Sequence, residues 1–159
     1  MASTITAGTL KVTIKEEIYL KGKNQGEITE LSIASVNEIS KRILTITTNE
    51  STIATFSGAV ASAGHFNDSA VRYIRFTNLD DTNFITLTFR NQDNDEAAIK
   101  LDAGQSFIWN GDNANGMTAV LNATEDADAA SSTNFGSLTN IQADADTAAV
   151  DLEVFIASA

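Results

Sequence analysis

The chain has 159 residues, the usual length of one globular domain, and its 43% hydrophobic and 19% charged residues are typical of a folded protein. It has 21 acidic and 10 basic residues and a formal net charge of −11, which disfavours nucleic acid or anionic membranes as partners. It has no cysteine, which excludes disulfides, thiolate catalysis and metal sites with sulfur ligands.

The clearest pattern along the chain is strict alternation of apolar and polar residues. From Leu10 to Lys15 it places Leu10, Val12 and Ile14 on one face of a strand, which predicts a half-buried strand. The same alternation returns in three later segments, residues 85–90, 99–101 and 150–156. Four segments therefore favour the same kind of structure.

Further short segments rich in β-forming residues lie between these strands, at residues 28–33, 43–48, 52–56, 71–78, 106–109 and 117–122. Glycine, asparagine and aspartate turns separate them, at residues 21–26, 78–83, 91–96, 102–104 and 110–116. About ten short strands joined by tight turns are typical of an all-β protein. We therefore expect a single antiparallel β-sandwich or jelly-roll-like domain over residues 1–159.

Two segments allow other readings. Between Ile28 and Leu44, apolar residues partly follow a helical spacing, and one short helix is the alternative there. Residues 122–140 are rich in Ala, Ser, Thr, Asp and Asn, which predicts a long loop or an arm that orders against a neighbouring subunit.

No catalytic or cofactor motif is present in the sequence. His65 lies near Asp68 and Ser69, but no nucleophile turn accompanies them, so we expect no catalytic triad. Acidic clusters such as 93–96 lack the spacing of a calcium loop, and no glycine-rich phosphate loop occurs. We predict a protein that is not an enzyme and that has no catalytic residues, cofactor or metal.

The segments Val71–Leu87 and Lys100–Phe107 resemble small virion structural proteins of tailed bacteriophages, cyanophages in particular. In that pattern a strand ends in an Arg-hydrophobic-Thr-Asn turn, and a Leu-x-x-Gly-x-Ser turn precedes a third strand. The closing segment 147–156 resembles the C-terminal strand of such proteins. The resemblance covers about half of the chain and carries no active site.

The resemblance implies a structural protein of the virion, made in the host cytoplasm, and most of all a capsid decoration protein or fibre component. A tail or neck component and a carbohydrate- or receptor-binding β-sandwich are the alternatives. The expected partners are copies of itself, as a homo-oligomer with a trimer as the first guess, and other virion proteins. Tyr73 and Arg75, on one face of their strand, and Phe84 are the predicted interface residues. A glycan-binding module would expose Trp109, Tyr73 and Phe84, whereas an assembly protein would bury them.

Overall fold

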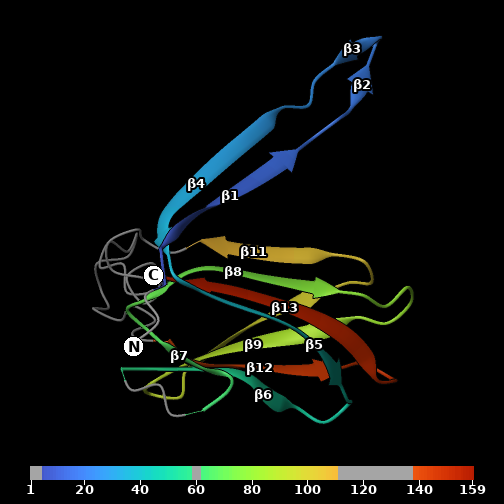
Figure 1. Cartoon of the computed structure of the whole chain (residues 1–159). Coiled ribbons are helices and arrows are strands. Elements are labelled where there is room, and N and C mark those ends of the chain that lie inside the picture. The colour runs from blue at the N-terminus through green and yellow to red at the C-terminus, as the bar shows by residue number, and fades with distance from the viewer. Residues whose placement is uncertain (1–4, 59–61, 111–137) are drawn as a thin grey trace, which may run out of the picture.

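The computed structural model describes residues 5–58, 62–110 and 138–159, and these residues form strands without a helix. The strands are β1 (Gly8–Lys15), β2 (Tyr19–Leu20), β3 (Lys23–Asn24), β4 (Ile28–Val36), β5 (Glu38–Ile46), β6 (Ser51–Ser57), β7 (His65–Asn67), β8 (Val71–Asn78), β9 (Ile85–Asn91), β10 (Glu96–Leu101), β11 (Ser106–Asn110), β12 (Leu138–Ala145) and β13 (Val150–Ser158). Figure 1 shows two packed layers and a hairpin that projects from one of them.

The two layers are a five-stranded sheet of order β10-β9-β12-β6-β7 and a four-stranded sheet of order β11-β8-β13-β5. All pairs in them are antiparallel except β6 with β7. The expected all-β class and antiparallel β-sandwich are thus confirmed. The strand order does not establish the jelly-roll form, which stays a prediction.

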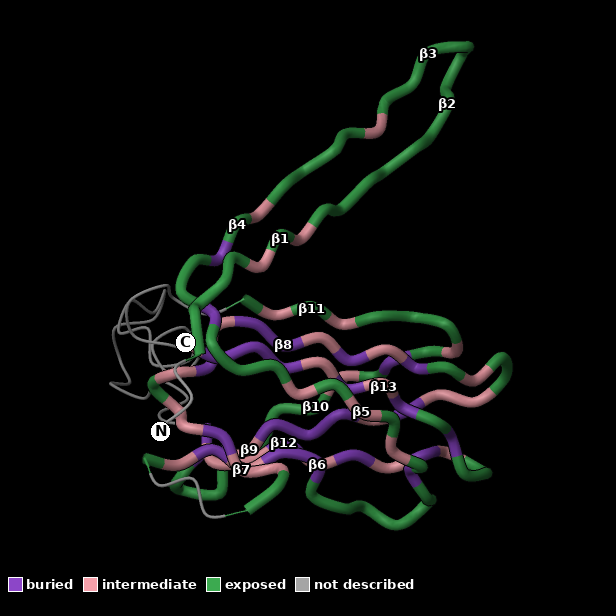
Figure 2. The backbone as a smooth tube through the Cα atoms, in the orientation of Figure 1, coloured by how far each residue is buried: buried purple, intermediate pink, exposed green. Residues whose placement is uncertain are grey.

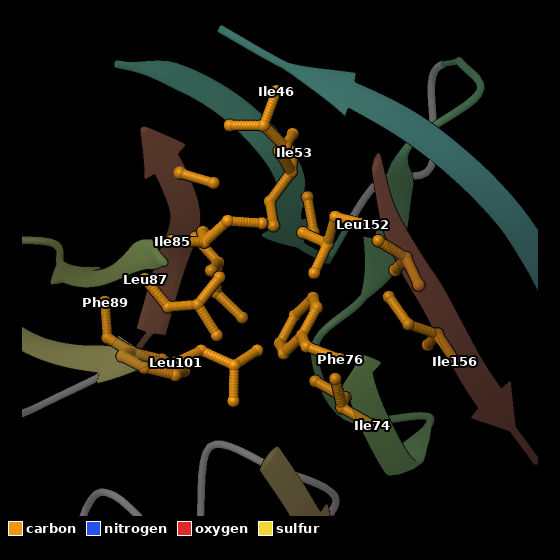
Figure 3. Packing of buried hydrophobic residues seen from close by; sticks show 14 of the residues in the cluster. Ile46, Ile53, Ile74, Phe76, Ile85, Leu87, Phe89, Leu101, Leu152 and Ile156 are labelled. Carbon is orange, nitrogen blue, oxygen red and sulfur yellow. The ribbon is translucent and has the colours of Figure 1, made fainter. Parts of the chain in front are cut away.

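The core lies between the two sheets and is built from the alternating residues of the strands. Ile85, Leu87 and Phe89 of β9 face Ile74 and Phe76 of β8 across it (Figure 3). Each of these side chains is buried, as strict alternation in a half-buried strand predicts. This core is therefore built from side chains of the two sheets, without side chains from the projecting hairpin.

Strands β1 and β4 form the projecting hairpin, and β2 and β3 form its tip (Figure 1). Leu10 pairs with Ile33, Val12 with Leu31, and Ile14 with Thr29, so these residues share one face. The predicted face of Leu10, Val12 and Ile14 is thus confirmed. We call residues 8–36 the arm.

Within the described residues, the buried contact between the arm and the sandwich lies at the base of the arm. There, Ile33 and Val36 form a second buried cluster with Tyr73 and Ala157. Figure 2 shows that the rest of the arm is mostly exposed. Twelve residues of extended chain separate Gly8 from Leu20, a distance of about 40 Å, so the tip lies well beyond the anchored base.

Two sequence-based expectations need correction. The short helix considered for residues 28–44 is wrong, because β4 and β5 occupy this stretch. Ser35 has a φ of +63° and shifts the alternation within β4, which gave the apolar residues a spacing close to that of a helix.

The predicted loop or arm at residues 122–140 is wrong at its end, because Leu138, Thr139 and Asn140 begin β12. Residues 122–137 and the strand expected at 117–122 lie outside the described residues. The sequence analysis predicts none of β2, β3, β7 and β12.

Candidate interaction surface

The outer face of the four-stranded sheet lies beneath the arm, and the strand register arranges its side chains in rows. The row under the arm base contains Asn110, Tyr73, Ala157 and Ile39, and the next row contains Ile108, Arg75, Phe155 and Lys41. The third row contains Ser106, Thr77, Glu153 and Ile43. The face is thus apolar near the arm and becomes polar away from it.

A groove of about 310 Å³ opens where the arm diverges from this face. Tyr73, Arg75, Ile108 and Phe155 line it from the sheet, and residues 10–13 line it from the arm. The ring of Phe155 meets Tyr73 edge-on, with centroids 5.9 Å apart. The groove is therefore mainly apolar and has two walls, the sheet and the arm.

A charged network on the outer face of the sheet reaches the groove through Arg75. The Arg75 guanidinium donates to Glu153 at 2.5 Å and to Thr77 Oγ1 at 2.7 Å, and Lys41 Nζ lies 3.1 Å from the second Glu153 oxygen. Hydrogen bonds from Lys41 and Arg75 hold the pKa of Glu153 below its ordinary value, although partial burial opposes them. Glu153 thus holds both cations and offsets the charge of one of them, so the network keeps a net charge of +1 and Arg75 is fixed in place.

The outer half of the arm carries exposed apolar side chains among its charged residues. Five of its large side chains are exposed by about half or more: Ile14, Ile18, Tyr19, Leu20 and Ile28. Ile28 pairs with Lys15, on the face opposite Ile14, so the arm carries exposed apolar groups on both faces. Exposed apolar side chains gathered on one element indicate an interaction site.

The structure places the three predicted interface residues differently. Tyr73 is only 3% exposed, because the arm base covers it, and this burial raises its pKa. Arg75 lies beside it on the groove floor. Phe84 is half-buried elsewhere, in the β8–β9 loop, with Lys100 Nζ 4.5 Å from its ring centroid. The structure thus brings Tyr73 and Arg75 together and leaves Phe84 apart from them.

Sequence reasoning missed the arm tip. The run Glu16-Glu17-Ile18-Tyr19-Leu20 held a signal, since three large apolar residues there follow two charges and precede a glycine turn. Such an apolar run is unusual for a loop exposed to solvent. Alternation alone, however, does not tell whether an apolar face is covered by the same chain or by another chain.

The residues considered for catalysis make contacts of other kinds. His65 is on β7, paired with Thr55, while the Ser69 hydroxyl donates to Asn67 Oδ1 at 2.8 Å. Over the described parts of the chain, no three His, Asp or Glu side chains are grouped in a way that could hold a metal ion. These residues therefore supply no argument for hydrolysis.

A second, polar pocket of about 280 Å³ lies at the open edge of the sandwich, lined by Arg42, Thr52 and His65 among others. The Arg42 guanidinium donates to the carbonyl of Ile53 across the two sheets, and burial lowers its pKa. A Cβ at Gly64 would lie 3.1 Å from this guanidinium. Arg42 thus links β5 to β6.

In the described ranges, no helix is long and apolar enough to cross a membrane. Comparison of the chain with protein families, curated proteins and solved structures gave no match.

Proposed function

We propose that this chain is a non-enzymatic structural protein of a bacteriophage particle, a capsid decoration protein or fibre component, which associates with copies of itself through its arm. The observation that carries this proposal is the arm, whose outer half exposes five large apolar side chains away from the sandwich. An isolated two-stranded hairpin is marginally stable in water, so an arm of this kind gains its stability from a surface that covers it.

The aromatic residues favour assembly over glycan binding. Trp109 packs edge-on against Phe89 with ring centroids 5.4 Å apart, and Tyr73 is buried under the arm. Among the described aromatic residues, Tyr19 at the arm tip is the one with an exposed side chain, 64% accessible. A glycan platform on the sandwich needs open aromatic rings, and these rings are occupied by packing.

Light scattering over a wide concentration range tests the self-association. We expect the full chain to form a closed oligomer, and a variant with Ile18→Ser, Tyr19→Ser and Leu20→Ser to be monomeric. The melting temperature of dilute, monomeric protein should be the same for both, because these side chains lie outside the core. A wild-type chain that stays monomeric at every concentration would contradict the proposal.

The place in a particle has its own test. Phage particles are purified on a density gradient from a culture in which this chain is produced. Mass spectrometry of these particles should detect the chain at a constant ratio to the major capsid protein. Its absence from intact particles, with abundant protein in the soluble fraction, would remove the virion role and leave self-association standing.

A further inference from the structure

We propose that the groove between the arm and the sheet receives the arm tip of a second copy of this chain. This inference rests on the proposed self-association and adds the acceptor site. The tip segment is Ile18, Tyr19 and Leu20, and the acceptor is the groove formed by Leu10, Val12, Ile108 and Phe155.

The first argument is continuity with a contact that already exists. At the arm base, Leu10, Val12 and Leu31 pack against the buried cluster around Tyr73, beside Phe155. Beyond the base, the apolar residues continue on both sides, as Ile14 on the arm and Ile108 on the sheet. The arm and the sheet diverge there, so the two surfaces do not cover each other (Figure 1).

The second argument is the match between two walls and two faces. The groove has an apolar wall on the sheet and another on the arm. The outer half of the arm exposes a large apolar side chain on each face, Ile14 on one and Ile28, beside Lys15 and Glu30, on the other. Both side chains are covered at once only when the arm enters a space between two surfaces, and the groove is such a space.

The third argument is the area. Eight large apolar side chains remain exposed on the arm and on the outer face of the sheet: Ile14, Ile18, Tyr19, Leu20, Ile28, Ile39, Ile43 and Ile108. With 39–64% of each residue exposed, they present on the order of 600 Å² of apolar surface. That is enough to supply the apolar share, a little over half, of the roughly 800 Å² that each partner buries in a stable interface.

The fourth argument is charge. Lys11, Lys15, Lys21 and Lys23 balance four glutamates in the arm, so the arm has no net charge and residues 37–159 hold the whole −11. Contact between two sandwich bodies brings like charges together, whereas contact between an arm and a body does not. Every copy has one arm and one groove, so the same contact repeated around a closed ring covers all of them.

Disulfide trapping between two single-cysteine variants tests this inference, and the natural absence of cysteine removes any background. Leu20→Cys marks the tip and Ile108→Cys marks the groove floor. Mixed and oxidised, they should form a disulfide-linked heterodimer. Ala98→Cys, exposed on the outer side of β10 in the other sheet, is the matched control and should form none with Leu20→Cys.

Complementation gives a second readout. Leu20→Lys places a charge at the tip, and Ile108→Lys places a charge in the groove. Each variant alone should associate at least tenfold more weakly than the wild type. Their mixture should recover heterodimers, because the intact tip of one variant meets the intact groove of the other. A variant that merely failed to fold could not be rescued in this way.

The outcomes separate this inference from the proposed function. Oligomers without a Leu20→Cys to Ile108→Cys disulfide, or with a dominant disulfide between two Leu20→Cys tips, would overturn the groove as acceptor and keep self-association. A monomeric wild type would overturn both.

Discussion

Asn78 is a buried polar residue that joins the β8–β9 loop to the end of β10 at one end of the sandwich. Its side-chain amide donates to the carbonyls of Asn83 at 2.9 Å and Leu101 at 3.1 Å, and its Oδ1 accepts from the backbone N–H of Asp80 at 3.0 Å. It is fully buried, so no water can replace these bonds. The Arg-hydrophobic-Thr-Asn turn noted in the sequence therefore has a structural cause.

Replacing Asn78 with alanine should lower the free energy of unfolding by about 2–3 kcal/mol, because two carbonyls and one N–H lose their partner in a buried site. Urea unfolding of the two proteins measures the difference. Asn49→Ala, at an exposed position in the β5–β6 turn, is the control and should change stability by less than about 0.5 kcal/mol. An equal effect at both positions would contradict the assigned role of Asn78.

Glu153 gives the sheet beneath the arm a pH dependence. Lys41 and Arg75 lower its folded pKa below the unfolded value, so its contribution to stability is complete above the unfolded pKa of about 4.3 and is lost as the pH falls through the folded pKa. Glu153→Gln should cost about 1 kcal/mol at pH 7, and the cost should shrink below pH 4. Urea unfolding of both proteins at pH 7, 5 and 3 measures this. A difference that stays constant with pH would show that the charge of Glu153 contributes nothing.

At the scale of elements, Gly26 sets the junction between the arm and its tip. A Cβ there would overlap the backbone of Glu16 and Glu17, and the Gly26 N–H donates to Asn24 Oδ1 at 2.9 Å. The tip strands β2 and β3 can therefore follow β1 and β4 only if residue 26 has no side chain.

Gly26→Ala should displace the tip and leave the sandwich intact. We expect trypsin to cleave after Lys21 and Lys23 several times faster in this variant, with the melting temperature of the monomer unchanged. Gly8→Ala is the matched control, since a Cβ there meets only the carbonyl of Val36 at 3.9 Å. Unchanged cleavage in Gly26→Ala would mean that the backbone absorbs the overlap.

The strands with strict alternation could be predicted because their sequence and their burial have the same period of two. β8 coincides with its predicted bounds, Val71–Asn78. β12 could not be predicted, because its inward positions include the small residues Ala143 and Ala145, and a register shift between Leu138 and Asn140 breaks the alternation. Alternation therefore does not predict a strand whose inward positions hold small residues or whose register is shifted by a bulge.

The candidate site could be predicted only in part. Placing Tyr73 and Arg75 on one outward face followed from alternation in β8, and the structure confirms that face. That Tyr73 would lie under the arm could not be predicted, because this contact joins strands more than thirty residues apart in the sequence. The break in the alternation of β4 lies at Ser35, whose positive φ no local pattern indicates.

At the scale of the whole molecule, charge is divided unevenly between arm and body. The arm is neutral, and residues 37–159, which we call the body, hold the net charge of −11. When copies associate through their arms, the short-range apolar contact favours association, and the long-range charge repulsion between the bodies disfavours it. The two terms respond differently to salt, because screening weakens only the first.

We expect association to become tighter as salt rises. Between 0.01 M and 0.15 M, the screening length falls from about 30 Å to about 8 Å, which removes most of the repulsion between bodies and leaves the apolar arm contact unchanged. Sedimentation equilibrium at both salt concentrations should give a dissociation constant at least severalfold lower in 0.15 M salt. Lys21→Ser with Lys23→Ser should keep this trend. Association that weakens with salt, and loses its salt dependence in that double variant, would instead show that ion pairs from the arm tip hold the copies together.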